Sequence, residues 1–103
     1  MNGKSTFGSV SKKYREKENL SQAKFANTLG EKMDNFSLSS QAVSLWENEE
    51  TQPSLDFLFR VYLLYNDWRK DWAIDAIIAK RPNLFMRDVD NGILVFRHDR
   101  AVN

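Results

Sequence analysis

The sequence has no cysteine, a single histidine and no long apolar segment. Without cysteine the chain can form neither a disulfide framework nor a thiolate metal site, and His98 alone cannot anchor a metal cluster. No apolar run approaches the length of about 18 residues that suggests a membrane span, and the beginning of the sequence lacks the apolar part of an export signal. We therefore expect a cytoplasmic protein with no membrane contact, no cofactor and no metal.

Glycine and proline are also scarce, with four and two residues, and no linker rich in either divides the chain. A chain of 103 residues is long enough for one hydrophobic core and too short for two. Apolar residues make up 42% of the sequence, which is enough to build that core. Residues 1–103 are therefore expected to form a single domain.

The net charge is only +1, but the charges are distributed unevenly along the chain. Residues 1–24 hold six cations and two anions, whereas residues 31–50 hold one cation and five anions. A polyanion would be attracted to the first segment and repelled from part of the second. The simpler alternative is an ordinary solvated charge pattern.

The spacing of apolar residues predicts two helices in the first third of the chain. One stripe runs through Phe7, Val10 and Tyr14 at helical intervals. Ser21 then stands as the N-cap of a second helix. This second helix is expected to run past its glycine to about Asp34, because a methionine prolongs the stripe and glycine inside a helix costs only about 1 kcal/mol.

Two further helices are expected around the first proline. The third should begin after Ser39 or Ser37, and the fourth after Ser54, which directly follows Pro53. The fourth helix is apolar nearly all round. That composition indicates a buried, central position.

The last third of the chain changes from helical to strand-like patterns. A fifth helix is expected in residues 66–81, with Trp68 and Trp72 in the core and a row of aspartates facing solvent. In residues 83–103, β-forming residues flank Asn91-Gly92, which signals a two-residue type I′ turn. Pairing across that turn would set Val89 opposite Leu94 and Arg87 opposite Phe96.

The third helix has an unusual outward face. At about 100° per residue, Ala42, Val43 and Trp46 gather on one side, with Glu47 at its edge. The opposite side holds Gln41, Ser44, Leu45 and Asn48. Such uncharged amides and hydroxyls suit a face that approaches base edges, because they donate and accept hydrogen bonds along defined directions. The alternative is that this small polar face simply contacts water.

Two segments, YREKENLSQAKFANTLG and SSQAVSLWENEETQPSLDFL, together resemble the lambda-repressor-like helix-turn-helix family, of the Cro/repressor or XRE type. The resemblance covers residues 10–65 and implies an all-α, five-helix DNA-binding domain. In that family the third helix enters the major groove and the second crosses the phosphate backbone. The expected organisation is a helix-turn-helix core in residues 10–65, a fifth helix and a small C-terminal β-hairpin.

The resemblance implies roles for individual residues. Base contacts are expected from Ser40, Gln41, Ser44 and Leu45. Phosphate contacts are expected from Gln22, Lys24, Ser39 and Asn48. Arg15 and Glu47 correspond to a structural ion pair that joins the first helix to the third in repressors of this type.

Two features depart from the family pattern. An insertion in residues 31–37 extends the linker between the second and third helices and could change the angle between them. After the third helix, Glu49 and Glu50 replace the usual glycine and basic residues. Carboxylates near phosphates oppose binding, so non-specific affinity should be weak unless these acids turn away from the DNA.

The sequence therefore predicts a sequence-specific transcriptional regulator of bacterial or phage origin that binds double-stranded DNA, an inverted-repeat operator, as a homodimer. No arrangement of a nucleophile and a base suggests catalysis. One alternative is an antitoxin that holds a toxin as its protein partner and regulates its own gene. Another is a helix-turn-helix fold that has lost DNA binding.

Overall fold

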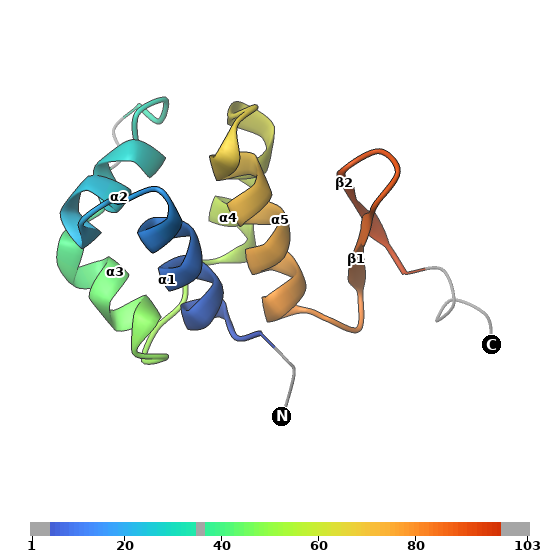
Figure 1. Ribbon diagram of the computed structural model, residues 1–103, viewed down its shortest axis with the longest axis horizontal. Helices are drawn as coiled ribbons and strands as arrows, with labels where there is room; N and C mark the ends of the chain where they lie inside the picture. Colours follow the sequence, from blue (N-terminus) through green and yellow to red (C-terminus); the bar gives the residue numbers. More distant parts are fainter. Residues whose placement is uncertain (1–4, 35–36, 98–103) are drawn as a thin grey trace.

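The computed structural model describes residues 5–34 and 37–97. Within these residues the chain forms five helices and a two-stranded antiparallel sheet (Figure 1). In chain order the elements are α1 (Phe7–Lys17), α2 (Gln22–Leu29), α3 (Ser40–Glu47), α4 (Leu55–Leu64), α5 (Trp68–Lys80), β1 (Phe85–Asp88) and β2 (Ile93–Phe96). The predicted helical fold with a small C-terminal hairpin is confirmed.

Each helix begins next to a short polar side chain that accepts a hydrogen bond from a backbone amide of the first turn. These N-caps are Thr6, Ser21, Ser39, Ser54 and Asp67. The first-turn amides have no partner inside the helix, which is why residues with a short side-chain oxygen are favoured here. The three serine caps expected from the sequence are confirmed, with Ser39 chosen over Ser37 for α3.

The end of α2 differs from the sequence expectation. The helix stops at Leu29, so its predicted continuation to Asp34 is wrong. In a longer helix the Leu29 carbonyl would accept a bond from the Met33 amide. Instead the buried Tyr65 hydroxyl donates to that carbonyl at 2.7 Å and accepts from the Lys32 amide at 3.0 Å. A side chain from the far end of α4 thus satisfies the groups that would have prolonged α2.

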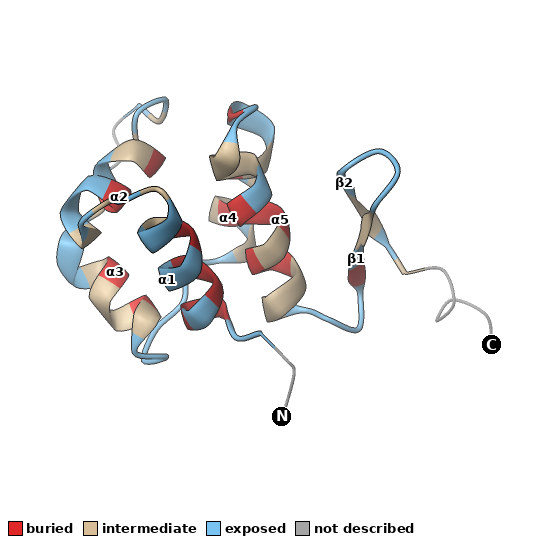
Figure 2. Cartoon of the chain, viewed as in Figure 1, coloured by how far each residue is buried: buried red, intermediate tan, exposed pale blue. Residues whose placement is uncertain are grey.

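The central helix is α5, and the expectation that α4 would be buried all round is wrong. α5 packs against α1, α4 and β1, and Figure 2 shows buried positions along α5 and on the adjoining side of α1. Trp72 is fully buried, as expected, and its ring contacts those of Phe7, Phe25 and Trp46. α4 meets α5 on one side only, which leaves Leu63 75% exposed on another.

The hairpin has a different turn from the one predicted. Asp88 pairs with Ile93, so the loop holds four residues, and Leu94 lies opposite Arg87 instead of Val89. A type I′ turn needs positive φ at both central residues, but of Asn91-Gly92 only the glycine has it, at 66°. The Asp88 carboxylate accepts bonds from the backbone amides of the next turn residues, which stabilises the longer loop.

An ion-pair cluster attaches the hairpin to the helices. Arg87 donates to Asp75 at 3.0 Å and to Asp71 at 3.4 Å, and the Tyr14 hydroxyl donates to the other oxygen of Asp75 at 2.6 Å. The aspartate row of α5 is therefore not simply solvated, as the sequence had suggested. It connects β1 to α5 and, through Tyr14, to α1.

Two sequence expectations concern parts of the molecule that bear little on the site. His98 lies outside the described residues. Among the helices in the described ranges, none combines the length and the apolar character that crossing a membrane requires.

Candidate nucleic-acid interface

The two sides of α3 differ as the angular analysis indicated. Val43 and Trp46 are buried against the core, at 0% and 4% exposure. Ser40, Gln41 and Asn48 are exposed, whereas Ser44 and Leu45 are half-buried. The five residues on the outer side carry no charge. Their hydroxyl, amide and methyl groups are the kinds that recognise base edges in a major groove.

α2 packs directly against α3, and the N-terminus of α2 adds polar groups next to α3. The Ser21 hydroxyl caps α2 by accepting a hydrogen bond from the Lys24 backbone amide at 3.1 Å. Lys24 itself is exposed. Ser39 caps α3 in the same way, through the Ala42 amide. Both helices therefore begin with ordered, partly positive N-termini, an arrangement that suits contact with phosphate.

Arg15 and Glu47 form an ion pair between α1 and the end of α3. The Arg15 Nε donates to one carboxylate oxygen at 2.6 Å and its Nη2 to the other at 3.1 Å. The side chains are 16% and 7% exposed. Such a two-pronged contact fixes the relative orientation of its partners better than a single bond does.

Two neighbouring groups extend this ion pair. The guanidinium also donates to the Leu20 carbonyl at 3.0 Å, and the Gln22 amide donates to Glu47 at 3.2 Å. The hydrogen bond with Glu47 raises the pKa of the Arg15 guanidinium above its ordinary value, so the cation persists at any working pH. Glu47 thus connects α1, α2 and α3 from one carboxylate. Its role is to orient α3 from the side opposite the outer face.

Glu49 adopts a conformation that a non-glycine residue rarely takes. Its φ is 62°, in the left-handed region. The Glu50 amide bonds to the Leu45 carbonyl at 2.9 Å and the Glu49 amide to the Trp46 carbonyl at 3.1 Å, which is the Schellman arrangement that ends a helix. Glycine usually occupies this position because a side chain there costs roughly 1–2 kcal/mol.

A contact with α1 offsets that cost. The Glu49 carboxylate accepts a hydrogen bond from the Thr6 hydroxyl at 2.5 Å and approaches the Gly8 amide at 3.4 Å. α1 has no acidic residue in its own first turn, so Glu49 supplies the negative charge that a helix N-terminus favours. This carboxylate is therefore directed at α1, although Glu49 and Glu50 are both exposed residues near the end of α3.

Gly8 permits the close approach of α1 and α3. A Cβ atom at this position would lie 2.5 Å from the Trp46 carbonyl oxygen and 2.5 Å from a Glu49 carboxylate oxygen. Sequence analysis did not identify Thr6, Gly8 or Glu49 as part of this junction. The available signals were a glycine within a predicted helix and a glutamate where the motif normally has glycine.

The insertion between α2 and α3 is held at its beginning by α5. Arg69 donates to the Thr28 carbonyl at 2.9 Å and to the Glu31 carboxylate at 2.8 Å. Asp67 binds the same guanidinium at 2.6 Å, and that contact lowers the pKa of the Asp67 carboxyl. Together with Tyr65, these groups fix where the chain leaves α2.

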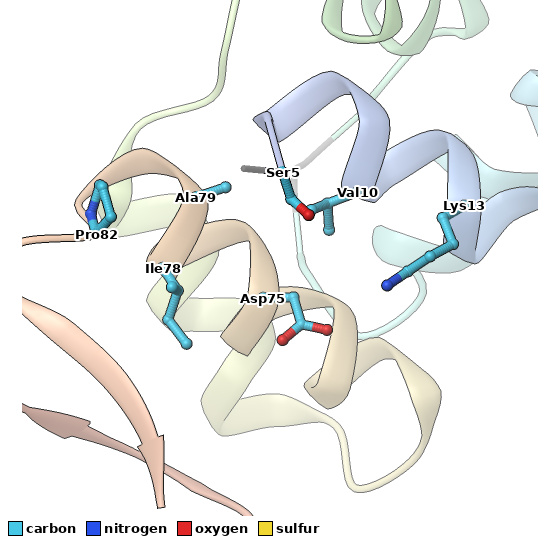
Figure 3. A pocket seen from close by; sticks show the side chains of 7 residues that line it. All are labelled: Ser5, Val10, Lys13, Asp75, Ile78, Ala79 and Pro82. Atoms are coloured by element: carbon cyan, nitrogen blue, oxygen red, sulfur yellow. The ribbon is translucent and has the colours of Figure 1, made fainter. Parts of the chain in front are cut away.

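A pocket of about 370 Å³ lies apart from α3, between α1 and α5 (Figure 3). Its walls include Val10 and Lys13 from α1 and Asp75 and Ile78 from α5. Asp75 is already engaged by Tyr14 and Arg87, as described above. The pocket belongs to the junction of these helices and not to the outer face of α3.

Comparison with known families gives one match, to a helix-turn-helix model. A helix-turn-helix family model matches residues 12–61, which span the second half of α1, all of α2 and α3, and most of α4. No curated protein and no solved structure gives a significant match. The order of the matched helices and the packing of α2 on α3 agree with that family's fold. Residues 12–61 thus belong to the helix-turn-helix family of the XRE, lambda-repressor-like type, a DNA-binding regulatory domain.

Proposed function

We propose that this protein is a sequence-specific transcriptional repressor of bacterial or phage type that binds an inverted-repeat operator as a homodimer. The observation that carries the proposal is the outer face of α3, which is uncharged, partly exposed and rich in hydrogen-bonding groups. The ion pair of Arg15 with Glu47 and the hydrogen bond from Thr6 to Glu49 attach this helix to α1 on the side away from the outer face. Repression would follow from occupation of a promoter in the cytoplasm.

Gln41 is the residue proposed to contribute most to sequence recognition. It is exposed and lies one residue after the start of α3, the end that reads bases in this motif. A glutamine amide matches the acceptor and donor of adenine, and such a two-bond contact contributes about 1–3 kcal/mol of discrimination. Ser40, Ser44 and Leu45 complete the proposed reading face, with Leu45 suited to a thymine methyl group.

Phosphate contacts are proposed at the N-termini of α2 and α3 and at the end of α3. The residues are Gln22, Lys24, Ser39 and Asn48. Gln22 already donates one side-chain amide hydrogen to Glu47, and its second amide hydrogen is the one proposed to bind a phosphate. These contacts set orientation and overall affinity, while the α3 side chains set sequence preference.

The experiment begins by selecting bound sites from a random DNA pool. Affinity for the selected site and for random DNA is then measured by fluorescence anisotropy at one fixed salt concentration. Gln41→Ala should weaken binding to the selected site by roughly tenfold or more and leave random binding nearly constant. Lys24→Ala, the matched control, should weaken both alike. Equal losses for Gln41→Ala on both DNAs, or no loss on either, would contradict the proposed reading face.

A second candidate function is that of an antitoxin, which would use the same α3 face to regulate its own gene. The observation that favours it is the apolar surface of α4 and the hairpin, where several large side chains are exposed. Co-expression with the product of the neighbouring gene and purification through a tag on one partner tests it. Recovery of a stoichiometric complex that dissociates the homodimer would favour this function.

A further inference from the structure

The loop that joins β1 to β2 carries the pair Asn91-Gly92. Both residues are exposed, and a Cβ atom added at Gly92 would meet no atom within 4 Å, so the space beside the pair is open to water. Asparagine is among the chemically labile residues of proteins, and glycine has no side chain that would hinder a reaction of the backbone beside it. The pair is therefore exposed to intramolecular attack unless its own hydrogen bonds prevent it.

The reaction available to this pair is deamidation through a cyclic imide. The Gly92 backbone nitrogen loses its proton and attacks the Asn91 Cγ atom, so that a carbon–nitrogen bond forms between them. The bond from Cγ to Nδ2 breaks, and the side-chain nitrogen takes up a proton and leaves as ammonia. Water then opens the five-membered imide at either carbonyl, which leaves an aspartate or an isoaspartate at position 91. The sum is the exchange of one water for one ammonia.

Asp88, the last residue of β1, holds the first of the two reacting groups. Its carbonyl oxygen accepts the Gly92 amide hydrogen at 2.7 Å. The proton that must leave is therefore held in a hydrogen bond, and such an amide exchanges its proton only after local opening. The Asp88 carboxylate is a poor base for this proton, because its hydrogen bond with Asn91 lowers the pKa of the carboxyl.

Asp88 also holds the group that would leave. The Asn91 Nδ2 donates to one carboxylate oxygen at 2.8 Å, and the other oxygen accepts from the backbone amides of Asp90 and Asn91 at 3.0 and 3.4 Å. These bonds restrict the rotation that brings Cγ onto the Gly92 nitrogen in the geometry for attack. A negative carboxylate beside the pair also disfavours the amide anion that must form. One residue thus restrains both reacting groups.

We propose that Asn91-Gly92 is a site of spontaneous deamidation and that Asp88 sets its rate. In the closed loop the pair is protected, and reaction proceeds from the fraction of molecules in which the Asp88 contacts are open. The reaction exchanges the amide that Asp88 binds for a carboxylate, so two like charges replace the 2.8 Å hydrogen bond. The modified loop therefore loses a contact that stabilised it.

The test follows the reaction in the full chain at about pH 8 and 37 °C by peptide mapping and mass spectrometry. Trypsin cleaves after Arg87 and Arg97 and releases the segment that contains Asn91 as one peptide. The folded wild-type protein should react at least about tenfold more slowly than the same chain unfolded in guanidinium chloride, because a hydrogen bond to a charged group favours the closed loop by about that factor. The second such pair, Asn2-Gly3, is the internal standard for the unfolded chain.

Asp88→Ala should accelerate deamidation of the folded protein by roughly tenfold or more, because it removes three side-chain hydrogen bonds. Exchange of the Gly92 amide hydrogen, followed by NMR, should accelerate by a similar factor, since both processes need the same opening. Asp90→Ala is the matched control. It removes the neighbouring acid, whose carboxylate accepts none of the loop bonds described above, and should change neither rate. Arg87→Ala removes the ion pairs with α5 and keeps the Asp88 contacts, so it should also react slowly.

Equal rates in the folded and the unfolded wild-type protein would overturn the proposal. An Asp88→Ala variant that reacts no faster than the wild-type protein, or whose amide exchange accelerates without its deamidation, would overturn it as well. So would an acceleration by Asp90→Ala or Arg87→Ala as large as that by Asp88→Ala, since loss of charge or loosening of the whole hairpin would then control the rate. These measurements involve no DNA, so their outcome is independent of the proposed function.

Discussion

Glu47 provides the most direct test of how α3 is held. Its carboxylate accepts two bonds from Arg15 and one from Gln22, and its side chain is only 7% exposed. Glu47→Ala removes all three bonds at once. It leaves the Arg15 guanidinium, itself 16% exposed, with the Leu20 carbonyl as its remaining partner among the contacts described above.

The expected loss follows from the burial of the pair. Removing one partner of a buried ion pair costs about 3–5 kcal/mol, whereas an exposed pair contributes about 0–1 kcal/mol. Because Arg15 keeps some access to water, we expect the lower end, about 3 kcal/mol in the free energy of unfolding. For a domain of this size, 1 kcal/mol shifts the thermal midpoint by roughly 4–8 °C, so the midpoint should fall by roughly 12–24 °C.

Urea unfolding followed by circular dichroism gives the free energy of unfolding, and a thermal scan gives the midpoint. Glu50→Ala is the matched control, since it removes an exposed acid three residues further on, and its effect should stay within about 0.5 kcal/mol. Arg15→Met combined with Glu47→Leu should recover much of the loss, because neither charge is then left unpaired.

A loss below about 1 kcal/mol for Glu47→Ala would refute this reasoning, since the pair would then behave as an exposed one. Glu47 would rejoin Glu50 as part of an acidic surface. A loss equal to that of the Glu50→Ala control would lead to the same conclusion.

Three further predictions follow from the same geometry. Glu50→Lys should raise affinity for operator and random DNA alike and steepen the slope of log affinity against log salt by about 0.9. The control Asp90→Lys, in the hairpin loop, should change neither the affinity nor the slope. An unchanged slope for Glu50→Lys would place this residue away from phosphate. Gly8→Ala should lower the free energy of unfolding by about 1–3 kcal/mol in urea titrations despite alanine's better helix propensity, because its Cβ would meet the Trp46 carbonyl oxygen; a stabilised variant would show that α1 can shift without cost. Burial and the hydrogen bond to Asp75 raise the pKa of Tyr14, so the stability that this hydroxyl contributes should be complete below about pH 10 and lost as pH rises further. Urea titrations at pH 8 and pH 11 measure this loss. Between these two pH values the free energy of unfolding should fall less for Tyr14→Phe than for the wild-type protein.

Local sequence signals were enough to place most helix starts and to divide α3 into a buried and an outward side. Ser21, Ser39 and Ser54 cap their helices because a short side-chain oxygen next to an apolar stripe is a purely local signal. The division of α3 into an inner and an outer side follows from the helical period, and Val43 and Trp46 are buried as that period requires.

The prediction failed where a distant residue decided the outcome. α2 ends at Leu29 because the Tyr65 hydroxyl, 36 positions away, takes its carbonyl. The hairpin loop is longer than the Asn91-Gly92 pair suggested. Its register is set by the Asp88 side chain and by the stacking of Phe96 on Phe85. Neither the hydrophobic period nor the turn preferences of the sequence can predict these contacts, because both depend only on neighbouring residues.

The tertiary structure also decided which apolar helix is central and what each acid near α3 does. Composition alone favoured α4 as the buried helix, but burial depends on how many sides have neighbours, and α5 has α1, α4 and β1 around it. Glu47, Glu49 and Glu50 are chemically identical and lie within four positions. The first binds Arg15, the second accepts a hydrogen bond from Thr6 at the start of α1, and the third lies exposed after α3. They differ because the helical period and one left-handed residue turn each carboxylate in a different direction.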